Sequence, residues 1–295
     1  MKQIIAERLE ALRNQMAQAH IDATVIPQTD PHHSEYIADH WQVRRWLSGF
    51  TGSAGTLVVT ADRALLWTDS RYFLQAADQL ADTPVELMKE GLPDTVSIEY
   101  FLTHNLKPGT IVGIDGNLFS LSETDAMRQD LEKHQISLDT HFDVIDSIWA
   151  DRPGLPDAKV FIHEAKYAGR EVNEKIADIL ASVTEQGATS ILVSALDEIA
   201  WILNIRSRDV NCNPVATSFL FIAPEGSTLF INEEKLTDNL RTYLADNNVR
   251  TLPYAGLKQF LADLPADARV LVEAARTSVA VFDTLGSRAV AGASP

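Results

Sequence analysis

The chain has 295 residues, 45% of them hydrophobic and 22% charged, so it can form two ordinary domains with cores and is not a disordered polypeptide. Its formal net charge of -16 opposes binding to nucleic acid and to anionic membranes. A single cysteine, Cys212, excludes an intrachain disulfide framework. The charged first residues lack a signal-peptide core, and no apolar run is long enough to predict a membrane span, so we expect a cytoplasmic protein.

The first half of the chain alternates predicted helices and strands. A helix at residues 4–19 leads to a strand at 23–27, and Asp30–Pro31 is interpreted as a turn and helix start, capped by Asp30 or Ser34. The remaining elements expected in this half are a hairpin at 55–60 and 64–69, helices at 70–80, 94–106 and 120–134, and strands at 85–89 and 110–115. Ser122 and Asp125 serve as the start signal of the helix at 120–134.

A segment rich in proline and glycine, Arg152–Lys159, is the best candidate for a linker. After it the order of elements repeats, with a helix at 171–187, a strand at 188–194, a hairpin at 217–232, a helix at 237–246, a strand at 269–274 and a closing helix at 278–286. We therefore predict an internal duplication with a period of about 160 residues and insertions. The expected domains are residues 1–154 and 155–295, each an α/β fold with a mixed sheet flanked by helices.

Three evenly spaced glycines, Gly49, Gly52 and Gly55, could suggest a phosphate-binding loop. No lysine follows them, and the next residues are β-branched and open a strand, whereas a P-loop or a dinucleotide fingerprint must open a helix. We expect them to allow positive φ angles and close backbone approach where the chain enters the sheet. Ser53 does not form a nucleophile elbow, because the spacing is one residue short and the strand follows the turn.

Two clusters have the residue types of metal sites, but simpler roles are available for them. The first contains His32, His33, Glu35, Asp39 and His40, which lack the order of a zinc-protease motif. The second, a possible nuclease cluster, contains Asp62, Asp69 and Asp115. Asp62 is better explained by the hairpin turn and Asp69 by capping of the helix that begins at Ser70. Cys212 lies in a loop without a nearby histidine in sequence, so we interpret it as an unreactive loop residue.

Arginines beside the glycines are the remaining candidates. Arg44, Arg45 and Arg71 could present guanidinium groups to a carboxylate ligand. The alternative, which we favour, is an ion pair with Asp69 or Glu35 that only fixes the loop.

The stretch "SEYIADHWQVRRWLSGFTGSAGTLVVTADRALLWTDSRYFLQA" resembles the amino-terminal domain of Xaa-Pro aminopeptidases, in the creatinase and prolidase superfamily. The stretch "ALDEIAWILNIRSRDVNCNPVATSFLFI" is similar to the start of the second domain of the three-domain, cytosolic-type members, although it departs from them at Ser207, Cys212 and Ala216–Thr217. The resemblance implies two creatinase N-terminal folds, ribonuclease H-like, that precede a carboxy-terminal "pita-bread" domain. This chain ends before such a domain, so we expect it to be the N-terminal two-domain fragment of an enzyme.

In such enzymes the resemblance places two metal ions, usually manganese, in the missing domain, so neither a catalytic residue nor a metal ligand is expected in this chain. Short peptides with proline second would be substrates of the whole enzyme, and Arg44, Arg45, Asp69 and Arg71 would lie nearest to them. The other expected partners are the enzyme's own catalytic domain and a second copy of the chain in a homodimer. One alternative stays open, a catalytically silent protein-binding module of the same fold. A creatinase or prolidase relative is a lesser alternative, because such relatives have a single amino-terminal domain and two copies are expected here.

Overall fold

The computed structural model describes residues 2–295, which fold into two compact units. The first unit contains residues 2–30 and 39–153, and the second contains residues 31–38 and 154–295. The chain therefore enters the second unit twice. The predicted boundary at residue 154 lies one residue beyond the point where the chain leaves the first unit, but the contribution of residues 31–38 was not foreseen.

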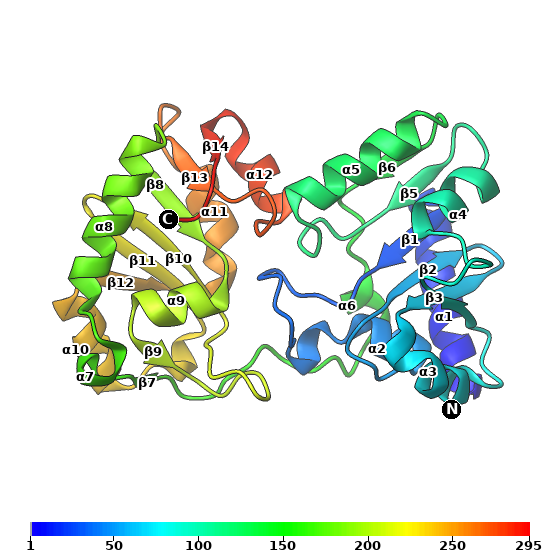
Figure 1. The fold of residues 1–295 in the computed structure, drawn as a ribbon, viewed down its shortest axis with the longest axis horizontal. Coiled ribbons are helices and arrows are strands. Elements are labelled where there is room, and N and C mark those ends of the chain that lie inside the picture. Colours follow the sequence, from blue (N-terminus) through cyan, green and yellow to red (C-terminus); the bar gives the residue numbers. More distant parts are fainter. Residues whose placement is uncertain (1) are drawn as a thin grey trace. The chain divides into compact units, whose positions relative to one another are not determined.

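The first unit is a six-stranded mixed sheet in the order β4-β3-β2-β1-β5-β6 (Figure 1). Its strands are β1 Ala23–Ile26, β2 Thr56–Thr60, β3 Ala64–Thr68, β4 Glu86–Lys89, β5 Ile111–Gly113 and β6 Ser137–Asp139. Its helices are α1 Lys2–Gln18, η1 Asp39–Trp41, α2 Val43–Ser48, η2 Ser70–Tyr72, α3 Phe73–Leu80, α4 Ile98–Asn105, α5 Leu121–Glu132 and α6 Ile145–Ile148. The expected hairpin is β2–β3, which pairs antiparallel with Leu57 opposite Leu66.

Apolar side chains project from both faces of this sheet, as expected for strands that are buried on each side. Leu57 and Leu66 pack on the face covered by α1, α2 and α3, where Leu9 is fully buried. On the opposite face the ring of Trp67 meets Phe101 of α4 edge-on at 5.5 Å. The amphipathic pattern of residues 4–19 is thus explained by burial of one side of α1 against the sheet.

The second unit repeats this plan, with the strand order β12-β11-β10-β8-β13-β14. Its strands are β7 Phe161–Ile162, β8 Ser190–Val193, β9 Ile205–Arg206, β10 Ser218–Ala223, β11 Gly226–Ile231, β12 Val249–Leu252, β13 Val270–Val272 and β14 Ala289–Ala291. Its helices are α7 Ala165–Ala168, α8 Val172–Glu185, α9 Leu196–Ile202, η3 Glu233–Lys235, α10 Asp238–Asp246, η4 Tyr254–Gly256, α11 Leu257–Ala262, α12 Val279–Leu285 and η5 Gly286–Arg288.

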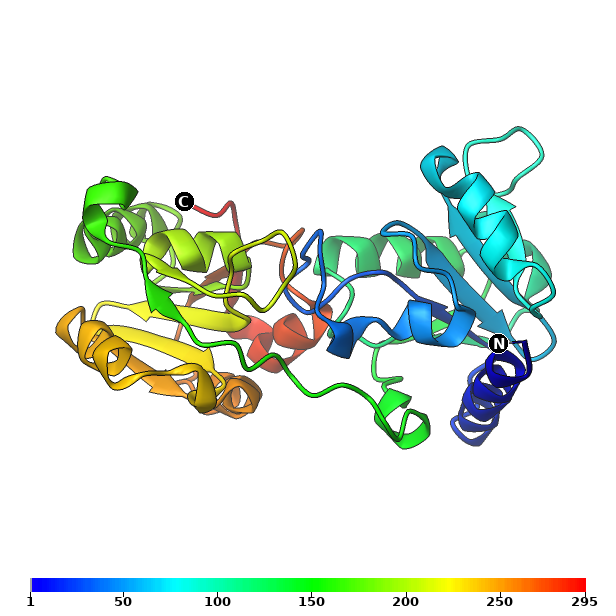
Figure 2. The same ribbon diagram turned by 90° about the horizontal axis from the view of Figure 1, so that it is seen from below.

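Alternation along β10 separates the two layers of the second unit. Leu220 and Ile222 face the cluster formed by α8, α9 and α10, whereas Phe219 and Phe221 face the cluster formed by α11 and α12. Figure 2 shows α8 and α9 on one side of the yellow strands and α11 on the other. The strand orders and pairing directions of the two units agree element by element, which confirms the predicted duplication.

Two local predictions are wrong. Residues 31–38 form turns and not the start of a helix, and the first helical turn after β1 begins at Asp39. Helix α5 is capped by Ser120, whose hydroxyl accepts from the Glu123 amide while the Glu123 carboxylate accepts from the Ser120 amide. The capping box lies two residues before the expected signal, Ser122 and Asp125.

Candidate functional site

The glycines between α2 and β2 are required by close packing. Gly49 ends α2 with φ 76°, in the left-handed region. A side chain at Gly52 would collide with the ring of Phe50 at 2.3 Å, and one at Gly55 would lie 2.7 Å from the Trp67 carbonyl oxygen. The expectation of close backbone approach is therefore confirmed, and these glycines form no phosphate cradle.

Arg44 lies beneath this glycine turn and is fully buried. Its Nε donates to the Gln28 side chain at 2.8 Å, one Nη donates to the Gly52 carbonyl, and the guanidinium carbon lies 4.8 Å from the centre of the Phe50 ring. Burial lowers the pKa of Arg44 to about 10, which leaves the group charged at neutral pH. Arg44 thus supports the turn from inside the unit, and in this conformation its side chain does not reach solvent.

The other arginine candidates are exposed. Arg71 donates to both carboxylate oxygens of Asp69, at 2.9 and 2.7 Å, and this pair lowers the pKa of Asp69. Asp69 also caps η2 by accepting from the Arg71 amide, as the sequence predicted. Arg45 lies on the exposed face of α2. The structure therefore brings Asp69 and Arg71 together, while Arg45 makes neither of the expected ion pairs among the described residues.

The remaining sequence candidates have local partners. The Ser53 hydroxyl is 2.6 Å from the Tyr72 hydroxyl. Asp62 accepts from the Thr60 hydroxyl in the hairpin turn, and Asp115 accepts from the amide and side chain of Asn117. Within residues 2–295, no three His, Cys, Asp or Glu side chains converge as metal ligands, so the residues present do not fit a dinuclear metal centre.

Asp115, considered from the sequence only as a member of a possible nuclease cluster, lies in a different setting. It follows β5 and lines a small, mostly apolar cavity together with Val25, Phe142, Asp143 and Arg152. Burial, and secondarily the negative charge of Asp143, raise the pKa of Asp115 to about 6. A half-buried carboxyl in this setting can exchange a proton near neutral pH. The raised pKa of Asp115 could not be predicted from the sequence, because Asp143 is distant along the chain.

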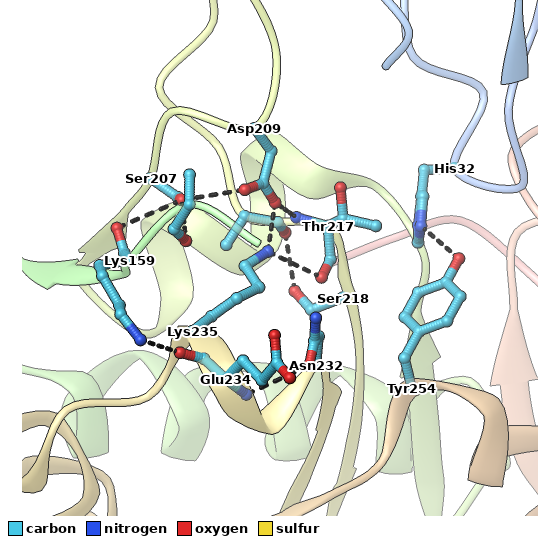
Figure 3. A network of polar contacts seen from close by, with 12 residues as sticks. His32, Lys159, Ser207, Asp209, Thr217, Ser218, Asn232, Glu234, Lys235 and Tyr254 are labelled. Carbon is cyan, nitrogen blue, oxygen red and sulfur yellow. Dashed lines mark hydrogen bonds and ion pairs between the residues drawn. The ribbon is translucent and has the colours of Figure 1, made fainter. Parts of the chain in front are cut away.

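The second unit contains a buried polar network (Figure 3). Lys235 of η3 forms an ion pair with Asp209, and the side chains of both residues are fully buried. Asp209 also accepts from the Thr217 amide at 2.7 Å and from the Ser207 hydroxyl at 3.2 Å. Ser207 is in turn hydrogen-bonded to the Ala158 carbonyl at 3.0 Å. Burial lowers the pKa of Lys235, and Asp209 opposes that shift.

His32 fastens residues 31–38 to the second unit (Figure 3). Its Nδ1 is 2.9 Å from the Ser194 carbonyl oxygen, and its Nε2 is 2.9 Å from the Tyr254 hydroxyl. The imidazole also lies 4.3 Å from the ring centre of Phe219, and only 2% of the residue is exposed. The histidine that might have suggested a zinc site is therefore a buried anchoring residue.

Comparisons with known proteins agree with these two units. The family model described as the Creatinase/Prolidase N-terminal domain matches residues 8–148, and a second model of the same description matches residues 151–295. Aminopeptidase P2 of Arabidopsis thaliana is 36% identical over 97% of this chain and 41% of its own length. A probable Xaa-Pro aminopeptidase P of Sordaria macrospora is 39% identical over 92% of this chain and 44% of its own length.

Among solved structures, the X-prolyl aminopeptidase of Caenorhabditis elegans matches with a TM-score of 0.91 and 30% identity, over 97% of this chain and 49% of that one. It is described as a cytosolic enzyme with a di-nuclear active site. The chain thus spans less than half the length of these relatives. Among residues 2–295, no helix combines the length and apolarity needed to cross a membrane.

Proposed function

Since this chain belongs to the creatinase/prolidase N-terminal family, which it represents with two consecutive domains, we propose that it is the non-catalytic N-terminal region of a metal-dependent Xaa-Pro aminopeptidase. The observation that carries the proposal is the agreement of both units with an X-prolyl aminopeptidase over 97% of the chain. The described residues also offer no converging metal ligands. The two divalent ions, with manganese as the favoured metal, and the attacking water belong to a part of the enzyme outside this sequence.

The role of the two units is to restrict access to the reaction centre and to support substrate binding or assembly. Arg45 is the strongest candidate for a substrate contact in the first unit, because it is exposed and its charge is not engaged by another described residue. Arg71 is a weaker candidate, since Asp69 already accepts two of its hydrogen bonds. Arg44 would act indirectly, through the glycine turn that it supports.

The first test is direct. The 295-residue chain, supplied with Mn²⁺, is expected to release no N-terminal residue from peptides that have proline second. The longer polypeptide with its metal-binding domain is expected to do so. Turnover by the 295-residue chain alone would contradict the proposal.

The access role is tested in the longer enzyme with Arg45→Ala. We expect kcat/KM to change by about three- to tenfold for one of two Xaa-Pro peptides of different length, because loss of a charge-assisted contact affects only the peptide that reaches it. Arg128→Ala is the control, since Arg128 is a partly exposed arginine of the same unit whose charge is already paired with Asp125 on its own helix. Unchanged kinetics on both peptides would remove Arg45 from the access role.

A catalytically silent binding module of the same fold remains the competing function. It predicts that the longer reading frame lacks the metal-ligand set of two aspartates, one histidine and two glutamates. A complete ligand set together with metal-dependent turnover would exclude it.

A further inference from the structure

Two arginines of this acidic chain stand apart from all the others. Every other arginine donates at least one hydrogen bond to an oxygen atom of the protein. Arg45 and Arg208 are exposed and make no hydrogen bond, ion pair or ring contact among the residues that the structure describes. In a protein with 41 acidic side chains, a guanidinium that pairs with none of the described carboxylates is available to an external anion.

The duplication puts these two arginines in corresponding segments. Arg45 lies between β1 and β2 of the first unit, and Arg208 lies between β8 and β10 of the second. Each segment carries the chain from the first central strand into the hairpin. Arg45 lies beside the evenly spaced glycines and could be proposed from the sequence, whereas no such motif lies beside Arg208.

The backbone around Arg208 is fixed by the buried network. Asp209, the next residue, is held by Lys235 and by the Thr217 amide, and the Ser207 amide donates to the Pro214 carbonyl at 3.3 Å. Both ends of the loop at residues 207–217 are therefore tied together beneath an exposed tip, where Cys212 has φ 64°. A wholly buried ion pair contributes little net stability over apolar residues of similar volume, so its better-attested use is to specify one conformation.

We propose that the loop at residues 207–217 is a preformed carboxylate-binding surface, in which Arg208 binds the C-terminal carboxylate of a short peptide and the Lys235–Asp209 pair positions that arginine. The ligand class rests on the proposed function, because the relatives are named for action on Xaa-Pro peptides. A free carboxylate accepts two parallel hydrogen bonds from one guanidinium, and a C-terminal amide does not provide that charge. Preorganisation of the loop lowers the conformational cost of binding.

The test uses the 295-residue chain and the tripeptide Ala-Pro-Ala as the free acid and as the C-terminal amide. We expect the acid to shift the backbone NMR resonances of residues 207–217 and to bind about three- to tenfold more tightly than the amide. Arg208→Gln should lower the affinity for the acid to that for the amide. Arg241→Gln is the matched control in the same unit, because Arg241 is already bonded to the Glu233 carbonyl oxygen, and it should keep the preference.

Equal binding of acid and amide, binding of neither, or an unchanged preference in Arg208→Gln would each overturn the proposal. An enzyme inactive on Xaa-Pro peptides would contradict the proposed function instead, so the two failures are distinguishable.

Positioning is tested with the double variant Asp209→Leu/Lys235→Met, which replaces the buried charges by apolar groups without leaving either one unpaired. Its circular dichroism should stay close to that of the wild type, whereas its thermal midpoint should fall, because the buried Thr217 amide loses its acceptor. We expect it to lose the acid preference and to increase the mobility of a nitroxide attached to Cys212. A folded double variant that keeps the preference would show that the pair does not position Arg208.

Discussion

At the scale of single residues, the buried charged side chains of this protein hold loops in place and do not face solvent. Arg44 is charged, fully enclosed and bonded to the glycine turn, and Lys235 is enclosed with a carboxylate partner. Arg44 in the first unit and Lys235 in the second therefore hold the segment that leads into the hairpin. Arg45 and Arg208, the two arginines without a partner among the described residues, lie on the outside of the same two segments.

Asp115 is the residue whose protonation should be visible in the stability of the fold. Its pKa is 3.8 when exposed and about 6 in the folded protein, so the folded state binds a proton that the unfolded state has already lost. Stability should consequently fall as the pH rises from 3.8 to about 6, and the loss should persist above that range. Asp115→Asn keeps an acceptor for Asn117 and removes the titration.

Urea unfolding of wild type and Asp115→Asn across this pH range measures the effect. The variant should become more stable relative to wild type as the pH rises, with the two proteins similar at the acidic end. A difference in unfolding free energy that does not depend on pH would contradict the raised pKa.

At the scale of elements, apolar periodicity and turn chemistry predict much of the structure. The hairpin β2–β3, the amphipathic helix α1 and the repeated order of strands follow from patterns that extend over several residues. Two kinds of feature cannot be predicted from such patterns. The start of α5 depends on which of two nearby serines forms the capping box with Glu123. The path of residues 31–38 depends on contacts with Ser194 and Tyr254, which are distant in sequence.

The candidate site shows the same division. The cap formed by Asp69 and the packing role of the glycines were predictable, because both are local. The burial of Arg44 and the pairing of Asp209 with Lys235 were not, because each requires knowledge of what a neighbouring segment covers.

The capping box of α5 allows a matched pair of substitutions. Ser120→Ala removes the side-chain acceptor for the Glu123 amide and should cost about 1 kcal/mol of stability. Ser122→Ala, the control, lies inside the helix, where alanine is favoured, and should be neutral or slightly stabilising. The unfolding free energies of the two variants measure the difference. Equal losses, or a greater loss at Ser122, would place the cap where the sequence had suggested.

At the scale of the whole molecule, the second unit is incomplete without eight residues from the first part of the chain. Residues 154–295 expressed alone lack His32, so the Ser194 carbonyl, the Tyr254 hydroxyl and the Phe219 ring lose their contacts with His32. We expect this fragment to have a lower thermal midpoint than the same unit in the whole chain.

A synthetic peptide of residues 30–39 should restore part of that midpoint, because a ligand that binds only the folded state stabilises it increasingly as its concentration exceeds its Kd. The same peptide with His32→Ala should have a smaller effect. Calorimetry of the fragment with each peptide measures this. Identical effects of the two peptides would mean that His32 is not the anchor.

The double entry of the chain into the second unit also sets an order for biosynthesis. Residues 31–38 leave the ribosome early, yet Ser194 follows His32 by 162 residues and Tyr254 by 222. Because N-terminal domains generally fold first during synthesis, we expect the first unit to fold before the surface that binds residues 31–38 has been made. A nascent chain arrested after the first domain would hold an unprotected stretch within an otherwise folded body, open to proteases and chaperones until translation has gone well past residue 254.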